Sequence, residues 1–210
     1  SLVDPVYRGK GIFQKLLSYL DEHKDIYKID FLVGFPVEAS KNSFIKNKWN
    51  NILDLTWFIK IINPLFFVFR FNEKKIFRTF QREADTNIDG YRDTFRLSKE
   101  KDFTDWRKGI YFSQQYYFYT YSKGSVSVKF QVKFSKRMRF ITEMIIGDIE
   151  TNTQDTSIIS EALNSLSKKT FSLGFVGMLT IAVNTHNKLH FSEAISSAGF
   201  FKTKKGIYFI

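Results

Sequence analysis

Strand patterns alternate with helical patterns along this chain, and that alternation limits the fold more than any other feature. Two short apolar runs, Ile29 to Phe35 and Phe175 to Val183, have the character of buried strands. Elsewhere apolar residues return every three or four positions, as on one face of a helix. This helical spacing covers Ile12 to about Asp21, Asp155 to Leu166, and Leu189 to Ala198. Alternating elements of this kind predict an α/β protein.

The middle of the chain favours a mostly antiparallel sheet. Tyr116 to Tyr121, Ser125 to Phe134 and Arg139 to Ile146 have the apolar or alternating pattern of strands, and Ser122-Lys123-Gly124 is a hairpin turn between the first two. We also expect shorter elements around this core. They are a helix at Ala39 to Asn47, a strand at Arg92 to Leu97, a helix at Lys99 to Lys108 capped by Ser98, an acidic loop at Asp148 to Asp155 and a last strand at Gly206 to Ile210.

The order of elements suggests that one unit occurs twice. A length of 210 residues fits one large domain or two small ones. The polar stretch Glu83 to Gly90 is the expected boundary, which gives a first unit at 1–85 and a second at 91–210. Because the chain starts on a strand end followed at once by a turn and a helix, we expect the first unit to lack its upstream strands.

An aromatic segment, Trp57 to Phe71, is the most apolar part of the sequence. Its longest uncharged run, Ile61 to Phe69, is far shorter than the roughly 20 residues that span a bilayer, and Pro64 interrupts it. Two alternatives remain, a buried strand pair and a segment lying on the surface, and we favour the buried pair. Aromatic side chains exposed here would suit an interface, so the sequence allows an oligomer.

Composition excludes several classes of site. The absence of cysteine excludes a disulfide scaffold, a Cys-based zinc site and a thiol nucleophile. The three histidines have no metal-binding spacing, so we expect no metal. The first residues do not resemble a signal peptide, and we expect a cytoplasmic protein with no transmembrane segment. The net charge of +11 fits either an ordinary basic surface or attraction to a polyanion.

The segment Tyr7-Arg8-Gly9-Lys10-Gly11, just before the first helix, is the strongest candidate for a binding site. Successive backbone N–H groups in such a turn form an anion-binding nest, and the helix adds the positive end of its dipole. Glycine lets a ligand approach the backbone closely, and Arg8 and Lys10 add positive charge. A basic loop that only joins two elements would have the same spacing.

This segment resembles the acyl-CoA-binding motif of the GNAT superfamily of N-acetyltransferases, in which Arg or Gln is followed by two residues, Gly, one residue, and Gly or Ala. Arg8 and Gly11 match, and the last position is Phe13 instead. The resemblance covers residues 1 to about 50. It implies acetyl-CoA or another acyl-CoA as co-substrate and a small-molecule amine or amino sugar as acceptor. The cofactor-binding residues that it implies are Val3, Arg8, Gly9, Lys10, Gly11, Ile12 and Phe13. The later segment, 92–210, resembles a full GNAT unit by element order only, and on that ground we expect two GNAT-like units in tandem.

The resemblance leaves the catalytic residues unassigned. The tyrosine that acts as general acid in many members aligns with Phe44, which has no proton to give. The second unit has Gly147-Asp148-Ile149-Glu150 and then Asp155 where the cradle would be, and carboxylates repel a pyrophosphate. We therefore expect only the first unit to bind CoA. Glu143 is a strand carboxylate that could act as a base or face solvent.

The alternative function is a non-catalytic basic module that binds nucleic acid or an acidic surface on a degenerate GNAT fold. Ser122 to Phe130 is similar to an RNA-recognition strand, but Ser125 and Ser127 replace the stacking aromatic residues. Nucleic acid is therefore the less favoured partner.

Overall fold

A computed structural model describes residues 4–34, 36, 38–81, 115–137, 140–184 and 189–209. The chain divides into two compact units. The first comprises Ser1–Trp57, Asn184–Asn187 and Thr203–Ile210, and the second comprises Phe58–Val183 and Lys188–Lys202. The expected boundary at 83–90, the strand at 92–97 and the helix at 99–108 lie outside the described residues.

The first unit contains a 3-10 turn and two helices. The turn is Pro5–Tyr7, and the helices are α1 (Ile12–His23) and α2 (Glu38–Lys46), both at their expected places. Leu17 of α1 and Phe44 of α2 are buried together, with Phe13 and Trp49 packed against them. The Ser18 hydroxyl also donates to Asn47 Oδ1 at 2.9 Å. A small apolar cluster with one polar contact thus holds the two helices together.

The expected strand at Ile29 to Phe35 is wrong for residues 29–34, which form no strand. Phe31 is 65% exposed, although the pattern predicted burial. An apolar run becomes a strand only when a neighbouring backbone pairs with it. Gly34 instead lies against a side chain: a Cβ there would be 2.8 Å from the Phe44 ring. Side-chain packing thus replaces strand pairing at this point.

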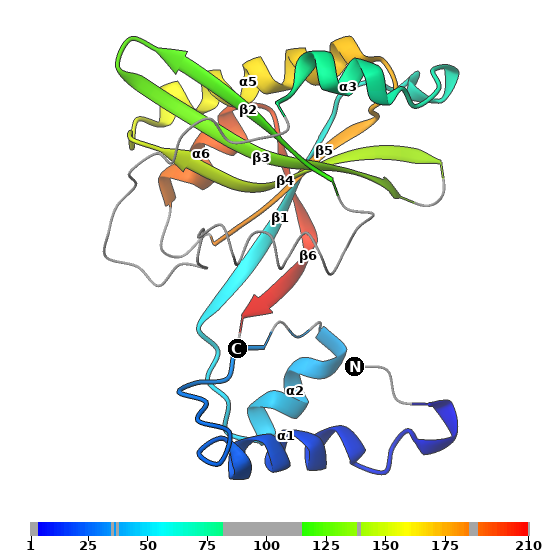
Figure 1. The fold of residues 1–210 in the computed structure, drawn as a ribbon, viewed down its shortest axis with the longest axis vertical. Helices are drawn as coiled ribbons and strands as arrows, with labels where there is room; N and C mark the ends of the chain where they lie inside the picture. The colour runs from blue at the N-terminus through cyan, green and yellow to red at the C-terminus, as the bar shows by residue number, and fades with distance from the viewer. Residues whose placement is uncertain are drawn as a thin grey trace. The chain divides into compact units, whose positions relative to one another are not determined.

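Six strands form one mixed sheet in the order β2-β3-β4-β5-β1-β6 (Figure 1). Their bounds are β1 Leu53–Ile61, β2 Tyr116–Lys123, β3 Val126–Arg137, β4 Ile141–Thr151, β5 Met178–Asn184 and β6 Phe201–Phe209. β3 is antiparallel to β2 and to β4, whereas β5 is parallel to β4. The expected three central strands and their hairpin are confirmed. The acidic loop is shorter than expected, because β4 continues through Asp148 to Thr151 and pairs with β3.

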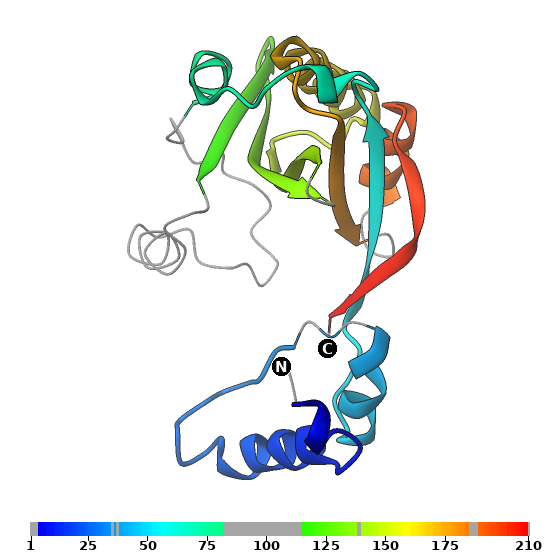
Figure 2. The same cartoon turned by 90° about the vertical axis from the view of Figure 1, so that its right-hand side faces the viewer.

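β1 lies in the sheet between β5 and β6, as Figure 2 shows in cyan, orange-brown and red. The expected strand pair at Trp57 to Phe71 is wrong after Ile61. There the chain turns at Asn63, whose Oδ1 accepts from the Leu65 N–H at 3.0 Å. A short 3-10 turn, η2 (Phe66–Val68), and the helix α3 (Glu73–Thr79) follow. Pro64 has no N–H to give to a ladder, which is consistent with the end of the strand.

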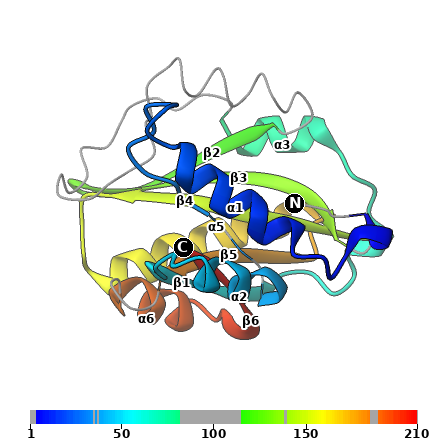
Figure 3. The ribbon, with the colours of Figure 1, turned by 90° about the horizontal axis from the view of Figure 1, so that it is seen from below.

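The helices of the second unit are α3, α5 (Thr156–Leu173) and α6 (Leu189–Ser197). α5 contacts α3, α6 and β2; Figure 1 shows α3 beside it, and Figure 3 shows α6 along it. Gly174 and Gly199, with φ of 83° and 81°, follow the ends of α5 and α6. None of the helices in the described ranges has the length and apolar character needed to cross a membrane.

The core lies between the sheet and α5. Thr170 of α5 and Met144 of β4 are both fully buried, and the Thr170 hydroxyl is 3.6 Å from Met144 Sδ. Some of the largest side chains are almost completely buried there. They include Phe130 and Met144 of the strands and Phe175 after α5. The aromatic excess of the sequence therefore serves partly as core.

Candidate functional site

The turn before α1 has the backbone of an anion-binding nest. Gly9 and Gly11 adopt φ of 77° and 68°, the left-handed region that other residues seldom enter. Gly11 occupies the N-cap position of α1, and no side chain caps the helix there. A Cβ at Gly9 would meet nothing within 4 Å, and one at Gly11 only Gln14 Oε1 at 3.8 Å. The first-turn N–H groups of α1 have no intrahelical partner, so they remain available to a ligand.

The charges around this turn favour an anion. Arg8 and Lys10 are exposed, and the Lys10 ammonium lies 5.0 Å from the centre of the Tyr7 ring. The nearby carboxylate of Asp4 forms a local hydrogen bond, in which its Oδ1 accepts from the Val6 N–H at 2.9 Å. Two cations beside uncapped helical N–H groups can hold a phosphate or pyrophosphate.

Phe13 does not line the nest. Its ring meets the Phe44 ring edge-on, with centroids 5.4 Å apart, and Phe44 meets Trp49 at 4.9 Å. The residue that departs from the family motif is therefore a core residue of the first unit. Ile12, beside it, is 41% exposed, and Val3 lies outside the described residues.

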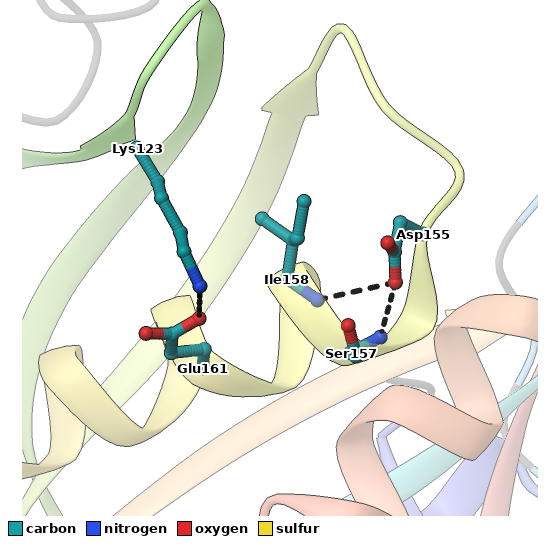
Figure 4. A network of polar contacts seen from close by, with 5 residues as sticks. All are labelled: Lys123, Asp155, Ser157, Ile158 and Glu161. Carbon is teal, nitrogen blue, oxygen red and sulfur yellow. Dashed lines mark hydrogen bonds and ion pairs between the residues drawn. The ribbon is translucent and has the colours of Figure 1, made fainter.

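In the second unit, the N-terminus of α5 is capped by a side chain, whereas that of α1 is not (Figure 4). Asp155 is the N-cap of α5, and its Oδ1 accepts from the N–H groups of Ser157 at 2.8 Å and Ile158 at 3.4 Å. The hydrogen bonds from Ser157 hold the pKa of this carboxyl below its usual value. The α5 N-terminus is thus already occupied by a negative group, and a pyrophosphate would have to displace it.

Two further carboxylates of the second unit, Glu161 and Glu150, lie near lysines. Glu161 accepts from the Lys123 ammonium at 2.7 Å (Figure 4), and this hydrogen bond raises the pKa of Lys123 and lowers that of Glu161. The β4 strand has a bulge at Gly147, where the register with β3 shifts between Gln131 and Val132. Beyond it, Glu150 lies 3.9 Å from Lys129. That the segment 147–155 does not bind CoA stays a prediction, and the carboxylate cap of α5 is consistent with it.

Glu143 faces the interior rather than solvent. It is 6% exposed, accepts a short hydrogen bond from the Thr180 hydroxyl and lies 3.7 Å from Arg137 Nε. A buried carboxylate held by a neighbouring strand and a cation is well suited to fix the β4–β5 pairing. It belongs to the second unit, whereas the glycine turn belongs to the first.

Lys60 was not among the residues that the sequence singled out, but the structure gives it long-range partners. The Lys60 ammonium donates to Asn164 Oδ1 at 3.0 Å and to the Ala198 carbonyl at 2.6 Å. Burial lowers its pKa. Lys60 also lines a shallow groove of about 260 Å³. The other residues of the groove are Ile61, Ile62, Ser167, Lys168 and Phe171. A lysine that follows an alternating strand pattern gives no local signal of these long-range partners.

No group of three metal-ligating side chains gathers anywhere in the part of the chain that the structure describes. His23, the histidine whose side chain is described, gives its Nδ1 to the Tyr19 carbonyl at 2.8 Å and stacks on the Tyr19 ring. It therefore serves to end α1.

Comparisons with known proteins give a result for the fold. No family model matches the sequence, and no curated protein matches it. Among solved structures, the chain is similar to a GCN5-related N-acetyltransferase from Sphaerobacter thermophilus, with 13% identity and a TM-score of 0.50. That match covers 99% of this chain and 69% of the other. A GCN5-related N-acetyltransferase from Anabaena variabilis ATCC 29413 matches with 10% identity and a TM-score of 0.48, over 98% of this chain and 52% of the other.

At such low identity the likeness concerns architecture. One mixed sheet flanked by helices contains the bulged strand β4 and its parallel neighbour β5. The helix α5 connects these two strands. The chain thus has the fold of the GCN5-related N-acetyltransferases.

Proposed function

We propose that this protein is an acyl-CoA-dependent N-acyltransferase whose co-substrate is held by the turn from Arg8 to Phe13. The observation that carries the proposal is the pair of left-handed glycines, Gly9 and Gly11, at an uncapped helix N-terminus. The GCN5-related fold is consistent with it. The contrast with α5 adds support, because Asp155 fills that helix end with a carboxylate.

Each residue of the turn has a separate task in this proposal. The backbone N–H groups of Gly11 and Ile12 would bind the pyrophosphate, and Arg8 and Lys10 would neutralise its charge. Phe13 would contribute by anchoring α1 to the core, since its ring packs on Phe44. Val3 stays a predicted neighbour of the pantetheine arm.

The reaction transfers an acyl group from the thioester to a small-molecule amine. A C–N bond forms, the C–S bond breaks, and the amine proton leaves as the thiol is released. Holding the two reactants together supplies much of the rate in such a transfer. Phe44 can donate no proton, and it is enclosed by Phe13 and Trp49. Positioning is therefore the main contribution that we assign to the first unit.

Calorimetric titration with acetyl-CoA tests the proposal. The wild type should bind, and an Arg8→Glu/Lys10→Glu variant should bind at least about tenfold more weakly, because both charges near the phosphates are reversed. Lys46→Glu, an exposed lysine of α2, is the matched control and should bind like the wild type. No binding to the wild type, or equal loss in the control, would refute the assignment.

A thermal shift separates this function from the basic-module alternative. A ligand at 100 times its Kd stabilises the fold by about 2.7 kcal/mol, which is readily measured. CoA should raise the Tm and an oligonucleotide should not. Salt-sensitive oligonucleotide binding without any effect of CoA would favour the alternative.

A further inference from the structure

A group of large apolar side chains in the second unit lies on the surface instead of in the core. Leu65, Phe67, Val68, Phe69 and Phe71 follow β1, and Phe171 lies on the last turn of α5. Each of them exposes about half of its surface or more, up to 70% for Phe67 and 65% for Val68. We call these six residues the apolar ledge. Exposed apolar residues that gather in one segment indicate a binding surface rather than chance.

The ledge is held firmly by its own neighbours. The buried Asn63 side chain donates to the Gly174 carbonyl at 2.5 Å, and the Ile62 N–H donates to the Gly177 carbonyl at 2.9 Å. The Phe71 ring lies 5.1 Å from that of the buried Phe175. Phe69 lies against Gly174, where an added Cβ would touch its ring at 3.4 Å. The segment 65–71 is therefore fixed over the end of α5, and the exposed side chains are presented by a packed backbone.

Positive charge accompanies the ledge. Residues 65–79 and 165–173 carry six exposed basic side chains and a single carboxylate, Glu73. The basic residues are Arg70, Lys74, Lys75, Arg78, Lys168 and Lys169. Arg70 lies between two ledge residues, and Lys168 lines the same shallow groove as Phe171. An apolar surface bordered by cations complements a surface with an apolar interior and negative headgroups.

The residue types distinguish a lipid surface from other partners. Protein interfaces are enriched in aromatic residues, including phenylalanine, and depleted in lysine, so the lysine-rich border of the ledge is the feature that argues against a protein partner. Four of the six ledge residues are phenylalanines whose rings could stack on bases, so oligonucleotide binding is an outcome that the test has to distinguish. Phenylalanine, leucine and valine with lysine and arginine beside them are typical of segments that insert into the boundary of a bilayer.

We propose that the apolar ledge docks this protein on the surface of a membrane that contains anionic lipids. Phe67 and Val68, the most exposed members, enter the acyl-chain boundary, while the basic border meets the headgroups. Docking by this ledge is peripheral and needs no helix that crosses the bilayer. It is independent of acyl transfer, because the ledge lies in the second unit and the glycine turn in the first.

Sedimentation of the full chain with vesicles tests the proposal. We expect binding to vesicles of phosphatidylcholine with phosphatidylserine, weak binding to phosphatidylcholine alone, and weaker binding as salt is raised. Phe67→Ser/Val68→Ser should reduce binding at least about tenfold, because the buried apolar area is lost. Lys74→Glu/Lys75→Glu should reduce it by a similar factor through charge reversal.

Matched variants away from the ledge control for general effects. Val6→Ser/Ile26→Ser changes two equally exposed apolar residues of the first unit, and Lys28→Glu/Lys46→Glu reverses two exposed lysines of that unit. Both should leave apolar insertion intact and bind within about twofold of the wild type. The proposal is overturned if the wild type does not bind anionic vesicles or if the controls lose as much as the ledge variants. It is also overturned if Phe67→Ser/Val68→Ser instead abolishes a dimer or oligonucleotide binding while vesicle binding persists.

Discussion

Gly177→Ala should destabilise the second unit by a predictable steric conflict. A Cβ at Gly177 would lie 2.8 Å from Phe66 Cδ1 and 3.1 Å from Ile141 Cγ2. Carbon atoms prefer separations of about 3.5–4.0 Å, so the Phe66 ring would have to retreat by roughly 0.7 Å. The backbone of Gly177 cannot easily give way, since its N–H donates to the Thr142 carbonyl at 2.8 Å and its carbonyl accepts from Ile62.

The size of the effect follows from two opposing contributions. Overpacking costs about 1–3 kcal/mol, and replacing glycine in an ordinary conformation returns about 0.4–1 kcal/mol by restricting the unfolded chain. Because the Gly177 backbone is held on both sides, we take the middle of both ranges and expect a net loss of about 1–2 kcal/mol. In a chain of this size, each kcal/mol lowers the Tm by about 2–4 °C. The variant should melt about 2–8 °C below the wild type, followed by circular dichroism of the sheet.

Gly147→Ala is the matched control. Its Cβ would meet only the Gln131 carbonyl oxygen, at an ordinary 3.7 Å, and neither glycine has a positive φ. We expect no loss of Tm. The double variant Gly177→Ala/Phe66→Ala should lose less than the sum of the single variants, because the small side chain removes the conflict. An unchanged Tm for Gly177→Ala, or additive single losses, would show that the steric reasoning is wrong.

Other perturbations address the remaining contacts. Phe44→Ala should cost about 3 kcal/mol by leaving a cavity in the small cluster of the first unit, and limited proteolysis should then cut α1 and α2 while the sheet stays intact; equal cleavage of wild type and variant would contradict this. Lys60→Met should lower the Tm, because the Asn164 and Ala198 oxygens lose their donor at a cost of about 1–3 kcal/mol; a Tm equal to that of the wild type would show that water replaces the donor. The Asp155 pKa is lowered in the folded state, so its stabilising effect is complete above its unfolded value of about 3.9 and disappears as the pH falls through the folded value. The Tm of Asp155→Asn should therefore fall less than that of the wild type as the pH is lowered. If the Tm of the two proteins depended on pH in the same way, the role of the cap would be refuted.

Local chemistry made several elements predictable from the sequence. The helix at Thr156–Leu173 begins after an N-cap aspartate and has an apolar face of regular spacing, and both signals are local. Its end at Leu173 lies beyond Leu166, where the expected helical spacing stops. The hairpin around Gly124, whose φ is 59°, is equally local. The glycine turn was recognised because Gly9 and Gly11 are spaced for a nest before a helix. Its backbone geometry agrees with that interpretation, and its ligand stays a prediction.

The sequence by itself thus determined four of the helices, α1, α2, α5 and α6, and the turn that is suited to an anion, because caps, turns and periodicity act over a few residues. It did not indicate α3, nor the extension of α5 to Leu173. Only the tertiary structure decided which strands pair. It placed β1 between β5 and β6, more than a hundred residues away in the chain, and left Ile29 to Gly34 without a strand. It also exposed the segment from Leu65 to Phe71, whose pattern predicted burial. An apolar run specifies that a partner is needed, but the partner comes from distant parts of the chain, and where the fold supplies none the side chains stay exposed.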